Sequence, residues 1–229
     1  MADGERGASG MLPRSTPKSP EPGPPQCGGC RDTGLEWVGE HSRFCGCDQG
    51  LARQREAWWR GCGVPLARRA ETLAAFQALP GTEKALAAAR EFVAGRVAWL
   101  LLYGPSGNGK SHLAIGITLA CLETGLQARW ANTFLLLSEF RAAPNLAGVL
   151  WELGRVPVLA LDELVWGTDL EARWVEEVIT RRYLEKMPLV VATNRDIKEV
   201  PAPIVSRFHE LGRVVLNRGK DYRRAEKAG

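Results

Sequence analysis

The residues of this sequence best suited to chemistry form a short glycine-rich stretch that ends in a lysine and a serine. They are Gly104, Pro105, Ser106, Gly107, Asn108, Gly109, Lys110 and Ser111. Glycines let the backbone wrap closely around an anion, so that successive amides and the start of a helix face its negative charge. The stretch fits the pattern G-x-x-x-x-G-K-[ST] between a predicted strand and a predicted helix, the context that this phosphate-binding loop requires. We therefore expect ATP here, with Lys110 near its outer phosphates and Ser111 as a ligand of Mg²⁺.

Two acidic residues follow an apolar run farther along the chain. Residues 158–161 have the composition of a buried strand, and Asp162 and Glu163 come directly after them. Parallel α/β sheets carry their chemistry at the carboxyl ends of their strands, so the pair is expected beside the phosphate-binding loop. There Asp162 would hold Mg²⁺, directly or through water, and Glu163 would orient and polarise the attacking water. Solvated loop acids are the alternative, but the pair favours ATP hydrolysis.

Four cysteines cluster near the amino terminus, in two close pairs on either side of a loop that contains the turn former Gly34. They are Cys27, Cys30, Cys45 and Cys47. Four thiolates suit a closed tetrahedral zinc site, although C-x-C is a less usual pair than C-x₂-C. Zinc binding worth roughly 10–16 kcal/mol would fold a segment too small to bury its own core. Free or redox-active thiols and an iron–sulfur site are the alternatives, and His41 could replace one zinc ligand.

The elements that must position these residues follow an α/β pattern. From residue 96 onward, short apolar runs alternate with longer amphipathic segments, as in a parallel sheet flanked by helices. Asn132 can cap a helix in which Leu135, Leu136 and Leu137 are expected in the core. The five expected strands are Val97–Tyr103, Gln127–Ala131, Val156–Leu161, Leu189–Thr193 and Val214–Leu216.

Composition divides the chain into four expected parts. Residues 1–25 are rich in proline and glycine with almost nothing apolar to bury, which predicts a disordered leader. Residues 26–50 form the predicted zinc-binding ribbon, 51–95 a helical linker, and 96–229 the nucleotide-binding domain. Within the linker, Trp58 and Trp59 are expected to pack on that domain, with base stacking as the alternative.

Charge and hydropathy exclude some functions. Lys and Arg outnumber Asp and Glu by 30 to 26, an excess that permits nucleic-acid binding without requiring it. No apolar run approaches the roughly 18 residues that a membrane span needs, so no membrane partner is expected. The amino terminus lacks the basic and apolar segments of a secretory signal, which favours a cytoplasmic protein.

Taken together, these motifs resemble the DnaC/DnaI/IstB group of AAA+ ATPases over roughly residues 60 to 224. The resemblance rests on the phosphate-binding loop, Asp162-Glu163, Thr193-Asn194 after the fourth strand, Ser206-Arg207, and a terminal Gly219-Lys-Asp-Tyr-Arg223. It implies a three-layer P-loop AAA+ domain of the ASCE class with a five-stranded parallel sheet and no carboxy-terminal lid domain.

The resemblance implies specific roles for three residues. Asn194 is similar to the polar sensor of the γ-phosphate, Arg207 resembles an arginine finger reaching a neighbouring subunit's ATP, and Arg223 matches the arginine that closes the family's ending. Asp221 departs from that ending, where the group has a small residue.

The resemblance also implies an ATP-dependent homo-oligomer and partners in DNA replication. The leading hypothesis is a helicase loader that couples ATP and single-stranded DNA binding to loading of a replicative helicase. An IstB-like transposition helper acting on duplex DNA is the alternative. A metabolic P-loop kinase and a nucleotide-binding adaptor with negligible turnover are two further readings. The Asp162-Glu163 pair and Arg207 tell against the kinase.

Overall fold

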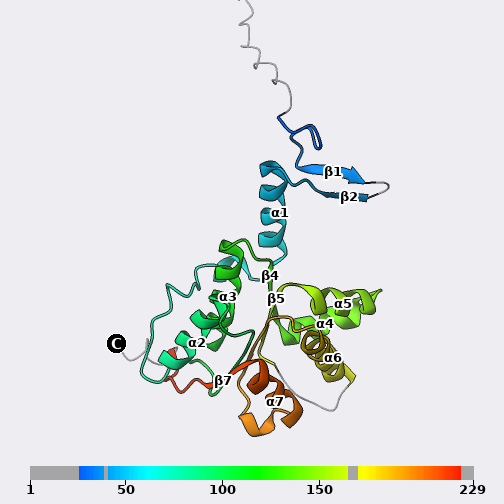
Figure 1. Ribbon diagram of the computed structural model, residues 1–229. Coiled ribbons are helices and arrows are strands. Elements are labelled where there is room, and N and C mark those ends of the chain that lie inside the picture. Colours follow the sequence, from blue (N-terminus) through cyan, green and yellow to red (C-terminus); the bar gives the residue numbers. More distant parts are fainter. Residues whose placement is uncertain (1–25, 39–40, 165–169, 223–229) are drawn as a thin grey trace, which may run out of the picture. The chain divides into compact units, whose positions relative to one another are not determined.

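The computed structural model describes residues 26–38, 41–164 and 170–222 (Figure 1). The predicted leader, residues 1–25, lies outside this part of the chain. The chain divides into two compact units, Met1–Gly50 and Leu51–Gly229. No helix in the described ranges is both long and apolar enough to cross a membrane.

The first unit contains a β-hairpin and the four clustered cysteines. Strands β1 (Leu35–Val38) and β2 (His41–Phe44) pair in antiparallel fashion, with Leu35 opposite Phe44. Helix α1 (Asp48–Gly61) begins after them and contains the boundary between the two units. A hairpin of two short strands is marginally stable alone, so this unit needs a further source of stability.

The second unit is built on a five-stranded parallel sheet, as the sequence predicts. Its order is β4-β5-β6-β3-β7, so β6 is the central strand and β4 and β7 are the edge strands. Strand β3, which leads into the phosphate-binding loop, lies between β6 and β7. The strands are β3 (Trp99–Tyr103), β4 (Ala128–Asn132), β5 (Val158–Asp162), β6 (Leu189–Thr193) and β7 (Gly212–Leu216). Their limits differ from the predicted ones by no more than two residues at either end.

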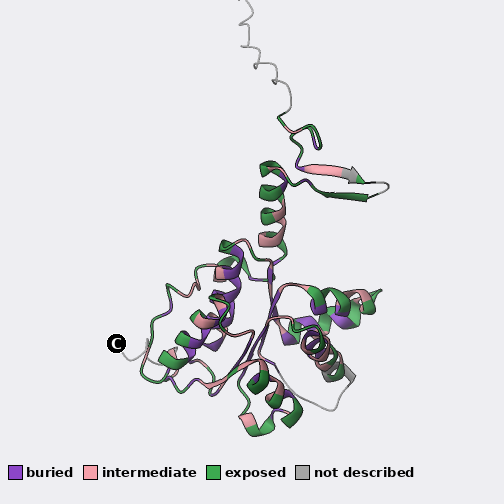
Figure 2. Ribbon diagram, in the orientation of Figure 1, coloured by how far each residue is buried: buried purple, intermediate pink, exposed green. Residues whose placement is uncertain are grey.

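Helices cover both faces of this sheet, which gives three layers (Figure 1). Alternate residues of each strand face opposite layers: Leu100 packs in one cluster with α2 and α3, and Leu101 in the other with α4 to α7. Buried residues accordingly fill the strands between the helical layers (Figure 2). The helices are α2 (Glu83–Val93), α3 (Lys110–Glu123), α4 (Thr133–Ala142), α5 (Leu146–Arg155), α6 (Leu170–Leu184) and α7 (Ala202–Leu211).

The segment predicted as a helical linker differs most from expectation. After α1 the chain contains only the short 3₁₀ helix Leu66–Arg68 until α2 begins. Cys62 is fully buried, and its carbonyl accepts a hydrogen bond from the Trp130 amide of edge strand β4 at 2.8 Å. Apolar side chains of this segment and of α2 belong to the core cluster around α3, so these residues form part of the second unit rather than a link to it. Trp58 and Trp59 pack partly buried against the same cluster.

The helix predicted after Asn132 is present, but its leucines do not all face the core. Leu136 is buried, whereas Phe134 and Leu135 are 56% and 64% exposed. Three consecutive residues of a helix project in different directions, so three apolar residues in a row cannot all lie in the core.

Candidate functional site

The phosphate-binding loop joins β3 to α3 in a conformation that glycine permits. Gly104, Gly107 and Gly109 have φ angles of 130°, 77° and 90°. Gly109 precedes α3 directly and offers no side chain to cap it, so the first amides of α3 remain available to an anion. A β-carbon on Gly109 would lie 2.6 Å from the Phe76 ring, which closes one wall of the loop.

Lys110 and Asn108 hold the loop together from inside. The buried Lys110 ammonium donates to the carbonyls of Gly104 at 2.9 Å and Pro105 at 2.6 Å, and to Asn108 Oδ1 at 3.1 Å. Asn108 and Asn217 exchange hydrogen bonds between side chain and backbone, at 2.5 and 2.8 Å. The segment after β7 therefore braces the loop, a contact that sequence reasoning did not predict because 109 residues separate the two asparagines.

Asp162 lies at the carboxyl end of β5 against the loop. It is 2% exposed, and its Oδ1 accepts a hydrogen bond from Ser111 Oγ at 3.0 Å. Burial, reinforced by the charge of Glu163, raises the pKa of Asp162 to about 6, although the Ser111 hydrogen bond opposes the change. A hydroxyl beside a buried carboxylate is a donor set that suits Mg²⁺, and a cation there would favour the ionised carboxylate.

Glu163 is held by a residue whose second role the sequence did not reveal. Asn132 caps α4 as predicted, since its Oδ1 accepts from the amides of Phe134 and Leu135 at 3.1 and 3.4 Å. Its Nδ2 also donates to Glu163 Oε2 at 2.7 Å. Glu163 has a φ of 55°, unusual for a residue with a side chain, and such strain is often found at functional sites.

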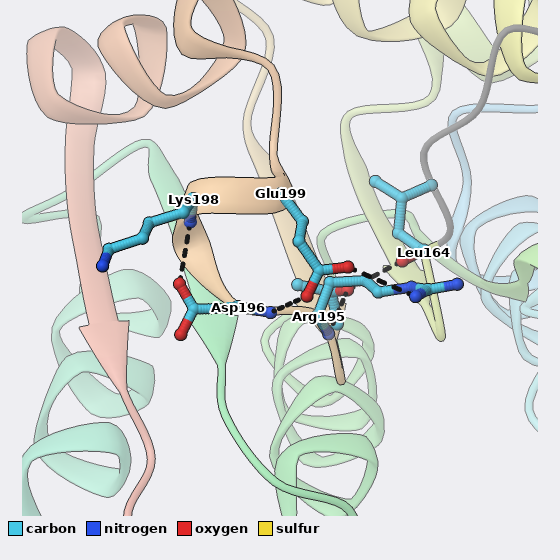
Figure 3. A network of polar contacts seen from close by, with 6 residues as sticks. Leu164, Arg195, Asp196, Lys198 and Glu199 are labelled. Carbon is cyan, nitrogen blue, oxygen red and sulfur yellow. Dashed lines mark hydrogen bonds and ion pairs between the residues drawn. The ribbon is translucent and has the colours of Figure 1, made fainter.

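Asn194 follows β6 in a turn that polar contacts make rigid (Figure 3). Thr193 Oγ1 donates to the Leu164 carbonyl at 2.7 Å and accepts from the Arg195 amide at 3.1 Å. Asp196 and Glu199 then form a capping box over the next short helix, and Arg195 pairs with Glu199 at 3.2 Å. The network ties the end of β6 to the segment after Glu163, so both elements present their polar residues at one edge of the sheet.

One cavity of about 490 Å³ lies beside the phosphate-binding loop. Most of the phosphate-binding loop, Glu163 and Asn194 all contribute to it, as the sequence predicts. Other lining residues come from the segment predicted as a linker, from the first turn of α3 and from the carboxy-terminal segment. They are Arg68, Glu71, Ala75, Phe76, Gln77, His112 and Tyr222.

No local pattern marks most of these additional residues. Phe76 packs edge-on against both His112 and Tyr222, with ring centroids 5.1 and 6.1 Å apart, and the Tyr222 hydroxyl donates to the Gln77 carbonyl. Arg68 pairs with Glu71 at 2.6 Å. Tyr222 is the exception, because it belongs to the terminal motif on which the family resemblance rests. An apolar wall beside a phosphate loop offers a surface for a nucleotide base.

Gly104, Pro105 and Asp162 adjoin residues that line this cavity but do not line it themselves. Arg207 and Arg223 are the two remaining predicted residues of the nucleotide site. Arg207 lies on α7, where its Nη1 donates to Thr180 Oγ1 at 2.9 Å and its guanidinium lies 4.9 Å from the centre of the Tyr183 ring. It does not line the nucleotide cavity of its own chain. Arg223 lies outside the described residues.

The four predicted metal ligands of the first unit come together. The sulfur atoms of Cys27, Cys30, Cys45 and Cys47 all lie within 4.8 Å of one another, with closest pairs of 3.7 and 3.4 Å. Four sulfurs at about 2.3 Å from a tetrahedral zinc ion lie roughly 3.8 Å apart, so the cluster fits zinc. Asp32 accepts hydrogen bonds from the amides of Gln26 and Cys27, both at 2.9 Å, and so shapes the first pair. His41 is exposed on β2 and is not part of the cluster.

Comparison with known families agrees with this geometry. The profile of the IstB-like ATP binding protein family matches residues 78–212, which include the phosphate-binding loop, Asp162-Glu163 and Asn194. This chain belongs to the IstB-like ATP-binding family. Membership supports ATP as the ligand of the cavity described above.

Curated relatives of this IstB-like protein are described as parts of insertion sequences. It is 32% identical over 136 residues to a putative insertion sequence ATP-binding protein of Sinorhizobium fredii, covering 55% of this chain and 44% of that protein. It is 30% identical over 168 residues to a putative ATP-binding protein in an insertion sequence of Mycobacterium tuberculosis, covering 66% and 65%. The chain therefore spans less than two thirds of each of these relatives.

Solved structures show that the IstB-like protein shares its fold with DnaI and with the DnaC helicase loader. The crystal structure of DnaI aligns with a TM-score of 0.60 at 21% identity, covering 69% of this chain and 93% of that one. The crystal structure of the DnaC helicase loader aligns with a TM-score of 0.60 at 20% identity, covering 67% and 100%. At this level of identity the likeness concerns the fold.

Proposed function

We propose that this IstB-like protein is an ATP-hydrolysing helper of DNA transposition that assembles on duplex DNA in its ATP-bound state. The observation that carries the proposal is the family match across the nucleotide site, together with curated relatives described as insertion sequence proteins. The loader-like solved structures support only the shared fold, so the helicase-loader hypothesis gives way to the alternative.

ATP binding follows from the phosphate-binding loop and the hydrogen bonds that hold it in place. The amides of the loop and of the first turn of α3 surround the phosphates, and Lys110 exchanges its loop contacts for contacts with phosphate oxygens. The apolar wall at Phe76 and Tyr222 receives the base. Ser111 and Asp162 would hold Mg²⁺, which neutralises charge on the phosphates during transfer.

Hydrolysis needs a base and a contact to the γ-phosphate. Glu163 orients and deprotonates the attacking water, with Asn132 holding its carboxylate until ATP is in place. Asn194 reaches the γ-phosphate or the water from the rigid turn after β6. Arg207 acts on the ATP of a neighbouring copy, which makes the active unit a homo-oligomer; we assign Arg223 to the same nucleotide site.

The test uses Glu163→Gln, which should bind ATP without hydrolysing it. With ATP, this variant should form assemblies on duplex DNA that sediment faster than free protein, and Lys110→Ala should form none. Wild type should form them transiently and hydrolyse ATP faster with duplex DNA. Equal assembly without ATP would refute the proposal. Retention of a replicative helicase, with no assembly on duplex DNA, would favour the loader instead.

A further inference from the structure

A second cavity lies at the opposite edge of the sheet from the nucleotide site. Its volume is about 520 Å³, and it is bounded by the starts of β4 and β5, the end of α5 and the last turns of α1. In a parallel sheet these amino ends of the strands face away from the carboxyl ends that carry Asp162 and Asn132. A ligand in this cavity would therefore not touch bound ATP.

Trp151 gives the cavity an aromatic surface. It is 51% exposed on α5, whereas a tryptophan without a role on the surface is usually more deeply buried. The Arg155 guanidinium, one helical turn later, lies 5.1 Å from the centre of its ring. The arginine covers part of the indole and restricts its motion. The rest of the indole ring is a fixed flat surface on which another flat group can stack.

Trp58 and Arg129 line the cavity with this pair. Trp58 packs partly buried against the core, so its position is fixed. The Arg129 side chain, at the start of β4, pairs with the half-exposed Glu139 at 3.4 Å, an ion pair of the weak surface kind. Two arginines and two tryptophans thus face one opening, against a single acidic lining residue, Glu152.

We propose that this cavity binds single-stranded nucleic acid, with an unpaired base stacked on Trp151 and the adjoining phosphates bound by Arg155 and Arg129. Stacking on aromatic side chains combined with cations along the backbone is how single strands are bound without sequence preference. The two arginines favour this ligand over a proline-rich peptide, which binds aromatic grooves without needing positive charge. The site is additional to the duplex binding proposed above and does not depend on it.

The experiment measures fluorescence anisotropy of a labelled 15-nucleotide oligo(dT) with the full chain, without ATP. Trp151→Leu keeps an apolar side chain but loses stacking, and should weaken binding roughly tenfold, within the range of one lost base stack. Trp151→Phe should restore most of the affinity. Arg155→Gln should weaken binding and reduce the salt dependence by about one phosphate contact. Leu184→Ala, on an exposed position of α6, is the matched control and should bind like wild type.

A second readout locates the strand. An oligonucleotide carrying 5-iododeoxyuridine should crosslink to the peptides that contain Trp151 or Trp58, and Trp151→Leu should still hydrolyse ATP at the wild-type rate. The proposal is overturned if oligo(dT) binds all variants equally or crosslinks elsewhere. The proline-rich peptide of residues 12–25 serves as the competing ligand. The proposal is also overturned if Trp151→Leu abolishes binding of this peptide but leaves oligo(dT) binding unchanged. Loss of duplex assembly by the IstB-like protein, with single-strand binding intact, would refute only the proposed transposition function.

Discussion

At the scale of single residues, the asparagine at the end of β4 connects a helix cap to the carboxylate that we propose as the catalytic base. Asn132 uses its oxygen for the amides of α4 and its nitrogen for Glu163. The two ends of one amide therefore link the start of α4, where Phe134 and Leu135 are exposed, to Glu163, the proposed catalytic base.

Asn132→Asp separates the two roles, because aspartate caps a helix as well as asparagine but places a second negative charge against Glu163. We expect ATP hydrolysis to fall roughly 10- to 100-fold, part of the 10²–10⁴ that a positioned base contributes. Affinity for ATP should stay within about twofold of wild type. Asn132→Ser, which keeps a cap without the charge, should lose less activity. Steady-state hydrolysis and binding of a fluorescent ATP analogue check this, and wild-type turnover in Asn132→Asp would contradict it.

At the scale of elements, one buried arginine holds the layers together. Arg182 of α6 is fully buried, and its Nη1 donates to the carbonyls of Leu153 and Val156 at 2.8 Å. Its Nη2 donates to the carbonyls of Pro157 and Pro188, just before β5 and β6 begin. A single side chain therefore satisfies the backbone where α5 ends and two central strands begin.

Arg182→Met should destabilise the fold by about 3–5 kcal/mol, since several buried carbonyls lose their donor at once. The neighbouring Arg181→Met should cost less than about 1 kcal/mol, because Arg181 makes only a partly exposed ion pair with Glu177 at 3.3 Å. Urea unfolding followed by tryptophan fluorescence gives both values. Equal destabilisation by the two substitutions would show that the carbonyl contacts of Arg182 are not responsible.

The hairpin unit has no such buried arginine among its described residues, and we propose that a zinc ion held by the four cysteines stabilises it. Cys30→Ser should remove most of about one equivalent of zinc from purified protein and expose residues 26–47 to limited proteolysis. The thermal unfolding of the second unit should change little. Cys121→Ala, which replaces a buried thiol of α3, is the control that should keep its zinc. Full zinc content in Cys30→Ser, measured by atomic emission, would contradict the assignment.

At the scale of the whole molecule, Arg207 lies apart from the nucleotide cavity of its own chain. Glu163, Asn194 and Ser111 line the cavity, whereas Arg207 is hydrogen-bonded to Thr180 of α6. This placement is compatible with the role proposed for Arg207 at the ATP of a neighbouring copy, and that role predicts that hydrolysis depends on assembly.

Arg207→Ala should lower hydrolysis by about a thousandfold, the size of a lost arginine finger, while ATP affinity changes little. Mixing it with Lys110→Ala should restore part of the activity, because one mixed interface then joins an intact cavity to an intact arginine. Arg60→Ala, which removes an exposed arginine paired with Glu56 on α1, should remain active. Unchanged thermal unfolding of Arg207→Ala excludes a folding defect, and the absence of rescue in the mixture would contradict action between subunits.

The sequence by itself determined the features that depend on neighbours along the chain. The phosphate-binding loop, the strands, the cap at Asn132 and the cysteine pairs follow from local spacing, and the structure has the strands and the cap where they were predicted. Only the tertiary structure decided which distant segments complete the site. Phe76 and Tyr222 line the cavity because residues 62–77 and 217–222 pack on the loop. Such packing is set by long-range burial and, apart from Tyr222 in the terminal motif, leaves no local pattern. For the same reason residues 51–95 were predicted as a linker.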